Sequence, residues 1–386
     1  GVHTPDPLCF PTYNFRGGGL RCCVRPGAYR LGAAGGYALF VNSAPLILGI
    51  ESTCDETGVA LVRNRTLLTD VTATSMDQHV RFGGIIPEIA SRAHLESFLP
   101  ALDSALEQAG VKLSDVDAIA CAAGPGLVGS LTVGITSAKG LAAALGVPLY
   151  GVNHVIGHLA IDMFVHGPLH DRFFGLVASG GDSNLLLIED LPHSVVELGG
   201  TLDDAAGEAF DKVGRLMGLP YPAGPHMDRL AASAQDPDAI RFPRGLGTGK
   251  DKERYKYDFS FSGLKTAVSR YLNEHPEADH AEVAAAFSES INDSLTAKAV
   301  RAAVDSGCKA IVVGGGFAAN SRLRSLLAER AGKEGIEVRI PPMRYCTDNG
   351  AQIAALGALL VEAGFPPSPA DFGPDSGMEL EQIYMS

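Results

Sequence analysis

Short apolar runs that are followed by polar loops recur along the chain and predict pairs of strands. LILGI opens the segment 46–64, the polar turn ESTCDETG follows it, and VALVRN predicts the returning strand. The same order recurs over 173–189, where FFGLVA, the loop SGGDS and NLLLIE follow one another. Two strand–loop–strand hairpins of one design predict two related lobes.

Longer segments around these hairpins have the length and patterning of helices. A third glycine loop, VVGGGFAAN at 312–320, follows an apolar run and opens a predicted helix from Ser321 to Glu329. The alternation of strands and helices predicts an α/β architecture. The other predicted helices cover residues 90–109, 131–145, 204–217, 281–306 and 347–363.

The first 44 residues differ in composition from the rest. They contain four arginines and a single acidic residue, Asp6. An arginine-rich, acid-poor segment is typical of an organellar transit peptide, and we expect a mitochondrial protein, with the plastid as the alternative. A disordered tail or an upstream translation artefact would have the same composition. The arginines are Arg16, Arg21, Arg25 and Arg30.

The overall composition is that of a globular protein with room for two domains. Of the 386 residues, 46% are hydrophobic and 19% are charged, and the formal net charge is −13. A nucleic-acid partner therefore requires locally clustered basic residues. The seven cysteines form no CxxC pair, which favours a reducing compartment over a disulfide framework. No apolar run approaches the ~20 residues that span a bilayer, so we expect no membrane partner.

Two glycine-rich loops could bind an anion through their backbone. SGGDS offers unobstructed N–H groups, and GGGFAAN adds a helix N-terminus, whose dipole favours negative charge. Glycines in such loops more often serve only a tight turn. Their place on matching hairpins and at a strand-to-helix junction favours a nucleotide in a cleft between the lobes. Neither loop is a GxxxxGK[ST] phosphate loop.

Two histidines four residues apart stand in VNHVIGHLA at 152–160. On a helix His154 and His158 share one face, so both rings can reach one cation. They could equally be two core histidines bonded to backbone carbonyls. Zinc proteases with this spacing need Glu after the first histidine, and here Val155 occupies that position. Asp348, in RYCTDNG, is a candidate third ligand, although a helix N-cap is its commoner role.

A basic stretch with interleaved aromatic residues covers 241–265. Seven basic residues face three acidic ones there, and aromatic rings can stack on RNA bases. From Tyr257 onward, YDFSFS alternates as a buried strand does, so we expect those rings in the core. We expect RNA contact from Lys250, Lys252, Arg254 and Lys256.

Eight stretches of the chain, in this order, resemble one family. It is the tRNA N6-adenosine threonylcarbamoyltransferases, formerly described as O-sialoglycoprotein endopeptidases or glycoproteases, and the resemblance covers residues 46–363. The sequences CDETG and SGLKTAV are closer to the bacterial and organellar branch of the family than to the cytosolic and archaeal branch. The stretches are GIESTCDETGVALV (49–62), GGIIPEIASRAH (83–94), AGPGLVGSLTVG (123–134), VNHVIGHLA (152–160), GEAFDKVGRLMGLPYPAGP (207–225), FSFSGLKTAV (259–268), VVGGGFAANSRLR (312–324) and CTDNGAQIA (346–354).

The resemblance implies an α/β, actin-like two-lobed ATPase fold with a central cleft. We divide the chain into a transit or disordered segment (1–44), an N-terminal lobe (45–165), a C-terminal lobe (166–345) and a C-terminal helix and tail (346–386). We expect that last helix to return to the N-terminal lobe. The family also implies a homodimer.

The implied activity is acyl transfer to tRNA. Family members move the threonylcarbamoyl group from threonylcarbamoyl-AMP to N6 of adenosine 37 in tRNAs that read codons beginning with adenine. The resemblance implies one divalent metal ion per subunit, zinc or iron, on His154, His158 and Asp348. It implies Glu56 and Lys212 as further cleft residues, and it assigns no catalytic residue. Asp211 is the one candidate for a general base, but we expect it to hold ribose or a backbone amide instead. The implied substrate contacts are Val177, Ala178, Ser179, Gly180, Gly181, Asp211, Gly224 and Asn320.

One position departs from the family pattern. The family usually has SGGHT where this chain has SGGDS, which puts the carboxylate of Asp182 beside a loop expected to meet a phosphate. Three other functions stay open on the residues alone. They are a small-molecule kinase of the same fold that uses magnesium, a non-catalytic scaffold, and the protease that Val155 disfavours.

Overall fold

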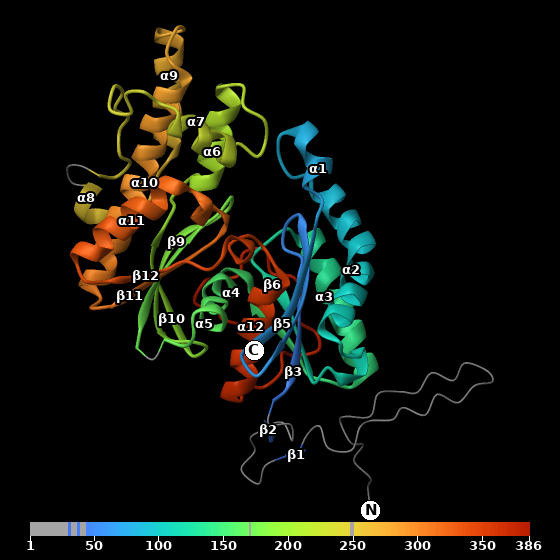
Figure 1. The fold of residues 1–386 in the computed structure, drawn as a ribbon. Coiled ribbons are helices and arrows are strands. Elements are labelled where there is room, and N and C mark those ends of the chain that lie inside the picture. The colour runs from blue at the N-terminus through green and yellow to red at the C-terminus, as the bar shows by residue number, and fades with distance from the viewer. Residues whose placement is uncertain (1–29, 32–36, 39–43, 170, 248–250) are drawn as a thin grey trace, which may run out of the picture.

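The computed structural model describes residues 30–31, 37–38, 44–169, 171–247 and 251–386 (Figure 1). Most of the segment 1–44, on which the transit prediction rests, and Lys250 lie outside the described residues. Two short strands near the amino terminus, β1 (Arg30–Leu31) and β2 (Tyr37–Ala38), pair antiparallel.

The N-terminal lobe contains a five-stranded sheet in the order β5-β4-β3-β6-β7. The predicted hairpin over 46–64 is confirmed, because β3 and β4 pair antiparallel, while β3, β6 and β7 run parallel. Strand β3 is buried along its whole length, as its unbroken apolar run requires. The strands are β3 (Leu46–Glu51), β4 (Glu56–Arg63), β5 (Thr66–Thr74), β6 (Ala118–Gly124) and β7 (Leu149–Asn153).

The C-terminal lobe repeats this arrangement strand for strand. Its sheet has the order β10-β9-β8-β11-β12, with an antiparallel β8–β9 hairpin and parallel β8, β11 and β12. The prediction of two related lobes is therefore confirmed. The strands are β8 (Phe173–Ala178), β9 (Ser183–Asp190), β10 (Ser194–Gly200), β11 (Ala310–Gly314) and β12 (Glu337–Arg339).

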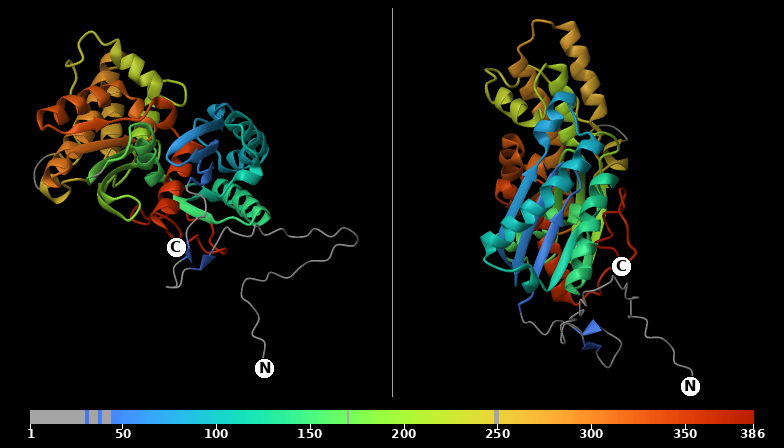
Figure 2. Two further views of the ribbon diagram at one scale, coloured as in Figure 1. Left: turned by 60° about the horizontal axis from the view of Figure 1, so that its bottom comes forward. Right: turned by 90° about the vertical axis from the view of Figure 1, so that its right-hand side faces the viewer.

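Helices cover the outer face of each sheet and extend the C-terminal lobe (Figure 2). Helix α2 packs on β4 and β5, α3 on β6, α10 on β8 and β11, and α11 on β12. Helix α2 begins three residues before the predicted start because Pro87 suits a first helical position. The bounds are α1 (Met76–His79), α2 (Pro87–Ala109), α3 (Val128–Leu145), α5 (Asp162–Val165), α6 (Ala206–Leu216), α7 (Gly224–Ala232), α8 (Asp251–Arg254), α9 (Ser262–Glu274), α10 (His280–Asp305) and α11 (Ser321–Lys333).

Two helices occupy the centre of the molecule, between the sheets. Helix α4 (His154–Ala160) follows β7, the last strand of the first sheet, and packs on β8 and β11 of the second. Helix α12 (Gly350–Ala363) follows β12, the last strand of the second sheet, and packs on β3 and β4 of the first. The two helices also contact each other, so each lobe contributes one helix that packs on the sheet of the other lobe.

Glycine allows α12 to approach its sheet closely. A Cβ atom on Gly58 of β4 would lie 2.3 Å from the backbone nitrogen of Gly350, the first residue of α12. A Cβ atom on Gly350 would in turn lie 2.6 Å from the backbone nitrogen of Ala60. No side chain fits between the helix start and the strand at this point.

One helix in the described part of the chain, α3, is long and apolar enough to cross a membrane by length and composition alone. In the fold it packs against β6 and α2. The test rests on length and composition, and in the fold 33% of this helix is buried.

Because backbone atoms oppose Gly58, we expect Gly58→Ala to lower the free energy of unfolding by about 1–3 kcal/mol or more, as overpacking does. Denaturant unfolding measures it. Gly373→Ala is the control, because a Cβ atom there would meet nothing within 4 Å. Equal unfolding midpoints for the two variants would contradict the close approach.

Candidate metal centre and nucleotide cleft

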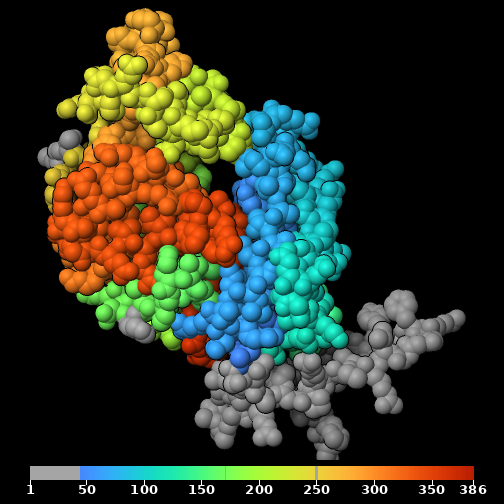
Figure 3. All heavy atoms as spheres, viewed as in Figure 1, coloured from blue at the N-terminus to red at the C-terminus, as the bar shows by residue number. Residues whose placement is uncertain are grey.

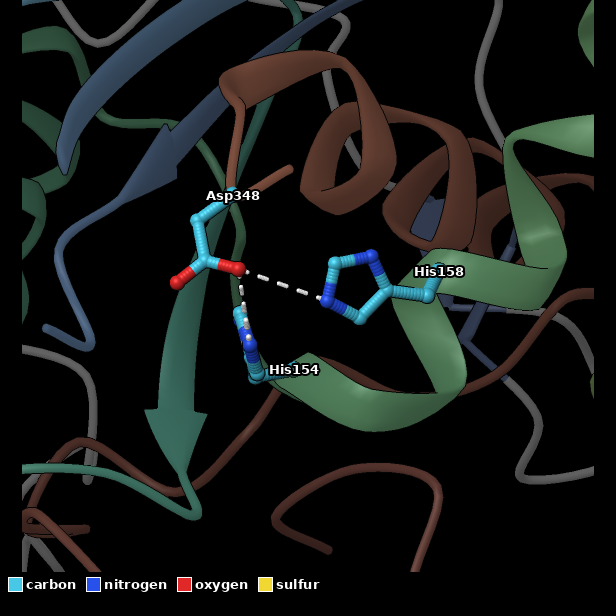
Figure 4. Close-up of side chains that lie close together, drawn as sticks. All are labelled: His154, His158 and Asp348. Atoms are coloured by element: carbon cyan, nitrogen blue, oxygen red, sulfur yellow. Dashed lines mark ion pairs between the residues drawn. The ribbon is translucent and has the colours of Figure 1, made fainter. Parts of the chain in front are cut away.

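Three predicted ligands, far apart in sequence, come together at the centre of the molecule (Figure 4). One ligand atom from each of His154, His158 and Asp348 lies within 4.8 Å of the others. Asp348 Oδ1 is 3.5 Å from His154 Nε2 and 3.4 Å from His158 Nε2. This arrangement offers two imidazole nitrogens and one carboxylate to a single point.

The local sequence explains how the two histidines converge. The Oδ1 atom of Asn153 accepts from the N–H groups of Val155 and Ile156, so helix α4 begins directly at His154. Helical spacing then places His158 on the same face, with ring centroids 4.9 Å apart. A Cβ atom on Gly314 would lie 2.7 Å from the Cβ atom of His158, so a glycine at the end of β11 leaves room for this histidine.

The bonding of His158 argues against an ordinary core histidine. Its side chain is buried, Nδ1 has no hydrogen-bond partner among the described residues, and Nε2 faces only the carboxylate of Asp348 at 3.4 Å. Buried polar atoms are normally satisfied, so the open Nδ1 atom and the long contact of Nε2 indicate a missing partner. Two nitrogens and one oxygen with open positions suit zinc or ferrous iron. The residues therefore fit the implied metal.

A buried carboxylate orients the other histidine. Glu51 Oε2 lies 2.9 Å from His154 Nδ1, while its Oε1 accepts from the backbone N–H of Thr53. A proton on Nδ1 is then shared with Glu51, which leaves the lone pair of Nε2 free for a metal. Sequence reasoning missed Glu51; its position at the end of a buried strand was the available signal.

The charges around the site favour a cation. Burial alone would lower the pKa of His154, but the carboxylates of Glu51 and Asp348 outweigh it and raise the pKa to about 10. Burial opposes ionisation of Asp348, but the two histidines lower its pKa to about 2. Burial and the neighbouring charges of Asp348 and Asp55 raise the pKa of Glu56 to about 10. An excess of buried carboxylates surrounds the ligands, and a metal ion would offset it.

The loop after β8 lies beside this site and is held by its own side chains. The hydroxyl of Ser179 accepts from the N–H groups of Gly181 and Asp182, and donates to Asp182 Oδ2 over 3.0 Å. Cβ atoms on Gly180 and Gly181 would meet nothing within 4 Å, so the tip of the loop is open to a ligand. The carboxylate of Asp182 turns back onto Ser179, yet its charge still helps to raise the pKa of His154.

Asp211 supports the turn that begins α7. Its Oδ1 atom accepts from the backbone N–H of Ala223 over 2.7 Å, directly before Gly224. Of the two roles expected for Asp211, ribose or a backbone amide, the structure shows the bond to a backbone amide, and its contact with substrate stays a prediction. Nothing lies within 4 Å of a Cβ atom on Gly224, so this turn also has an open side.

Two other candidates use their polar atoms within the fold. The Oδ1 atom of Asn320 caps α11 through the N–H of Leu323 and also accepts from Asn292. Lys212 pairs with Asp204 at 2.5 Å and with Glu208 at 2.9 Å. A ligand at Lys212 would have to compete with two carboxylates.

The lobes meet above the site. The guanidinium of Arg215, at the end of α6, donates to the carbonyl oxygen of Gly83, which precedes α2. In the space-filling view the region of α6 and α7 touches that of α1 (Figure 3). This contact joins the two lobes at a second place, apart from α4 and α12.

The predicted RNA-contact residues lie elsewhere. Lys252 and Arg254 are exposed on α8, and Lys256 pairs with Asp305 at 2.6 Å. Helix α8 is on the outer side of the C-terminal lobe, away from the N-terminal lobe. Phe259 and Phe261 are buried as expected, whereas Tyr257 is only half-buried and its hydroxyl donates to Asp305. The strand predicted there is wrong, because the chain forms only an isolated bridge from Phe259 to Thr201.

Comparisons with known proteins identify relatives of this chain. Residues 66–355 match the family model for tRNA N6-adenosine threonylcarbamoyltransferase. The chain is 52% identical over 347 residues to the protein of that name from Bifidobacterium adolescentis, and 51% identical over 347 residues to that from Bifidobacterium longum. Each match covers 89% of this chain and 100% of the relative.

The fold has relatives among solved structures. The crystal structure of T. kodakarensis HypF superposes with a TM-score of 0.58 at 14% identity, covering 83% of this chain and 48% of that one. At this identity the likeness concerns the fold alone. With the duplicated sheets, it confirms the predicted actin-like ATPase fold.

The raised pKa of Glu56 has a consequence for stability in the metal-free protein. In the unfolded chain the Glu56 carboxyl releases its proton near the ordinary pKa of 4.5, whereas in the folded state it keeps the proton up to a pKa of about 10. The free energy of unfolding therefore falls as the pH rises between these two values, because the folded state binds more protons than the unfolded chain. Glutamine has no proton to lose. We therefore expect Glu56→Gln to raise the thermal midpoint at pH 8, with the gain shrinking toward pH 5.

Thermal unfolding in the presence of a chelator measures this gain. Glu88→Gln, on the exposed start of α2, is the matched control and should change neither midpoint. A gain from Glu56→Gln that is equal at both pH values would show that titration of this carboxyl is not its cause.

Proposed function

Because the chain belongs to the tRNA N6-adenosine threonylcarbamoyltransferase family, we propose that it transfers the threonylcarbamoyl group of threonylcarbamoyl-AMP to N6 of adenosine 37. The transferase class and the tRNA substrate follow from the family. One observation carries the finer proposal: the His154–His158–Asp348 cluster lies against Gly314, and the next residue, Gly315, opposes the carbonyl of Ala178, which leads into the open Gly180–Gly181 turn. A metal-held donor and an anion-binding loop would share one cleft.

The reaction itself needs placement more than bond activation. N6 forms a bond to the carbamoyl carbon, the bond from that carbon to the phosphate oxygen breaks, and AMP leaves with the electron pair. One proton leaves N6 for solvent. The mixed anhydride already has a good leaving group, whereas the aromatic amine is a weak nucleophile, so orientation and charge stabilisation supply the rate.

Different residues of the cleft would orient the substrates and stabilise the developing charge. A divalent metal on the three ligands would polarise the carbamoyl carbonyl as a Lewis acid, or anchor the donor. Glu51 fixes the ring of His154, and the N–H groups near Gly180 and Gly181 would face the phosphate of AMP. Asp211 holds the turn before Gly224 in place. Zinc and iron are the proposed metals because two imidazoles suit magnesium badly.

A homodimer is also proposed. Leu95 and Leu99 lie one turn apart on α2 and are 66% and 62% exposed, an apolar surface that a second copy would cover. Light scattering should give about twice the 40.2 kDa mass of the chain. A monomer mass at micromolar concentration would contradict it.

The mitochondrial location, with the plastid as the alternative, stays a prediction from residues 1–44. The relatives named above are bacterial. Imaging the full chain fused to a fluorescent protein tests it. The RNA contacts of Lys250, Lys252, Arg254 and Lys256 likewise stay predictions.

Reconstitution tests the proposed reaction. With threonylcarbamoyl-AMP, a zinc or ferrous salt and an unmodified tRNA transcript that reads a codon beginning with adenine, we expect the modified nucleoside by mass spectrometry. His158→Ala removes one ligand, and a loss of several kcal/mol of charge stabilisation means at least about a 100-fold slower transfer. His193→Ala, a surface histidine, is the matched control. Wild-type protein that modifies no tRNA would overturn the proposal.

The acidic residue in the phosphate loop should weaken donor binding. Asp182→Asn keeps an oxygen that can accept from Ser179, so the turn survives while a negative charge disappears. We expect the KM for threonylcarbamoyl-AMP to fall about 5-fold, which corresponds to about 1 kcal/mol of relieved repulsion. Asp190→Asn, exposed at the end of β9, should leave KM unchanged. An unchanged KM in both variants would mean that the phosphate lies away from Asp182.

A further inference from the structure

The carboxyl-terminal tail, residues 366–386, lies across the strands that lead into the metal-bearing helix. The N–H of Met385 donates to the carbonyl of Gly151, and Tyr384 forms an antiparallel bridge with Val152 of β7. Ile383 and Tyr384 are buried and belong to the core of the N-terminal lobe. The tail is therefore part of the packed fold at this point.

Asn153 joins the tail to helix α4. Its Oδ1 atom accepts from two N–H groups in the first turn of α4. Its Nδ2 atom donates to the carbonyl oxygens of Glu379 and Gln382, both at 3.0 Å. The backbone N–H of Asn153 donates to the carbonyl of Ile383 over 2.9 Å. The side chain is fully buried, and every bond it makes links the helix to the tail.

Only a side-chain amide can perform both tasks here. Aspartate or serine could cap the helix, but a carboxylate has no N–H for the two tail carbonyls. An ionised aspartate would also bring its negative oxygen against them. The amide orientation follows from the donors on one side and the acceptors on the other.

The same tail also contacts the other lobe. Glu381 Oε1 accepts from the backbone N–H of Glu197, which belongs to β10 of the C-terminal sheet. The segment that holds the first turn of α4 is thus fixed to both sheets. A displacement of the tail would reach the residue next to His154.

We propose that Asn153 is a positioning residue through which the tail holds His154 and His158 in ligating geometry. The inference rests on the proposed metal site. Metal ligands need supporting contacts within a fraction of an ångström, and loss of such support typically weakens metal binding about 10- to 100-fold. The Asn153 amide and the tail supply that support from outside the ligand set.

The test compares zinc affinity and tail mobility in the full-length protein. Asn153→Asp keeps the helix cap and removes the two bonds to the tail, so we expect zinc affinity to fall about 10- to 100-fold by chelator competition. Hydrogen exchange of residues 378–386 should become faster in the same variant, with or without zinc. In the wild type, zinc should slow that exchange, because coupling is reciprocal. Asp279→Asn, at the exposed N-cap of α10, is the control and should change neither quantity.

A second variant keeps the test valid if Asn153→Asp does not fold. Tyr384→Ala removes a ring that packs on Phe365 at 5.5 Å and leaves Asn153 in place. It should loosen the tail and weaken zinc binding in the same direction. Circular dichroism and thermal unfolding establish that each variant is folded.

Two results would overturn the proposal. One is a mobile tail with zinc affinity within twofold of wild type, which would show that the tail does not position the site. The other is unchanged exchange in Asn153→Asp, which would show that Asn153 is not the link. Wild-type protein with a slowly exchanging tail that binds neither zinc nor ferrous iron would instead reject the metal site itself, together with the inference that rests on it.

Discussion

The packing of α4 against α12 between the two sheets is the contact on which the site depends. Each helix leaves its own lobe and lies on the other sheet, so the N-terminal ends of both meet at the centre. His154 and His158 come from one of these ends and Asp348 from the turn before the other. Glycines at 58, 314 and 350 leave the room this packing requires. A bulkier residue at any of them would separate the ligands or the lobes.

The electrostatics of the centre depend on the same packing. Crossing helices bring Asp348 to the end of the first sheet, where Glu51, Asp55 and Glu56 already stand. Burying several carboxylates together is costly, and the protein meets this cost by raising the pKa of Glu56 and by keeping His154 cationic. A divalent metal ion on the three ligands would displace the proton of His154, and its positive charge would offset the neighbouring carboxylates. The fold is therefore built for a cation before any substrate binds.

The local parts of this structure could be read from the sequence, and the non-local parts could not. Apolar runs and glycine loops predicted both hairpins, and helical spacing predicted that His154 and His158 share a face. The bond from Glu51 to His154 joins residues 103 positions apart, and no periodicity reveals such a pair. Alternation alone made YDFSFS look like a strand, although no neighbouring strand was available to Phe261. Asp348 was a candidate third ligand from its residue type alone, and the family resemblance favoured that role over a helix N-cap.

The two helices that position the proposed metal ligands, α4 and α12, each begin with a buried asparagine that caps the helix in the same way. Asn349 begins α12 as Asn153 begins α4: its Oδ1 atom accepts from Gln352 N–H, and its Nδ2 atom donates to the carbonyl oxygens of Tyr345 and Thr347. Both asparagines are fully buried, and each adjoins a ligand in the sequence, His154 or Asp348. An amide that caps a helix with oxygen and ties down flanking chain with nitrogen fixes the helix start in two directions. The two lobes thus present their ligands from helix ends anchored in the same way, and a rigid three-ligand site follows.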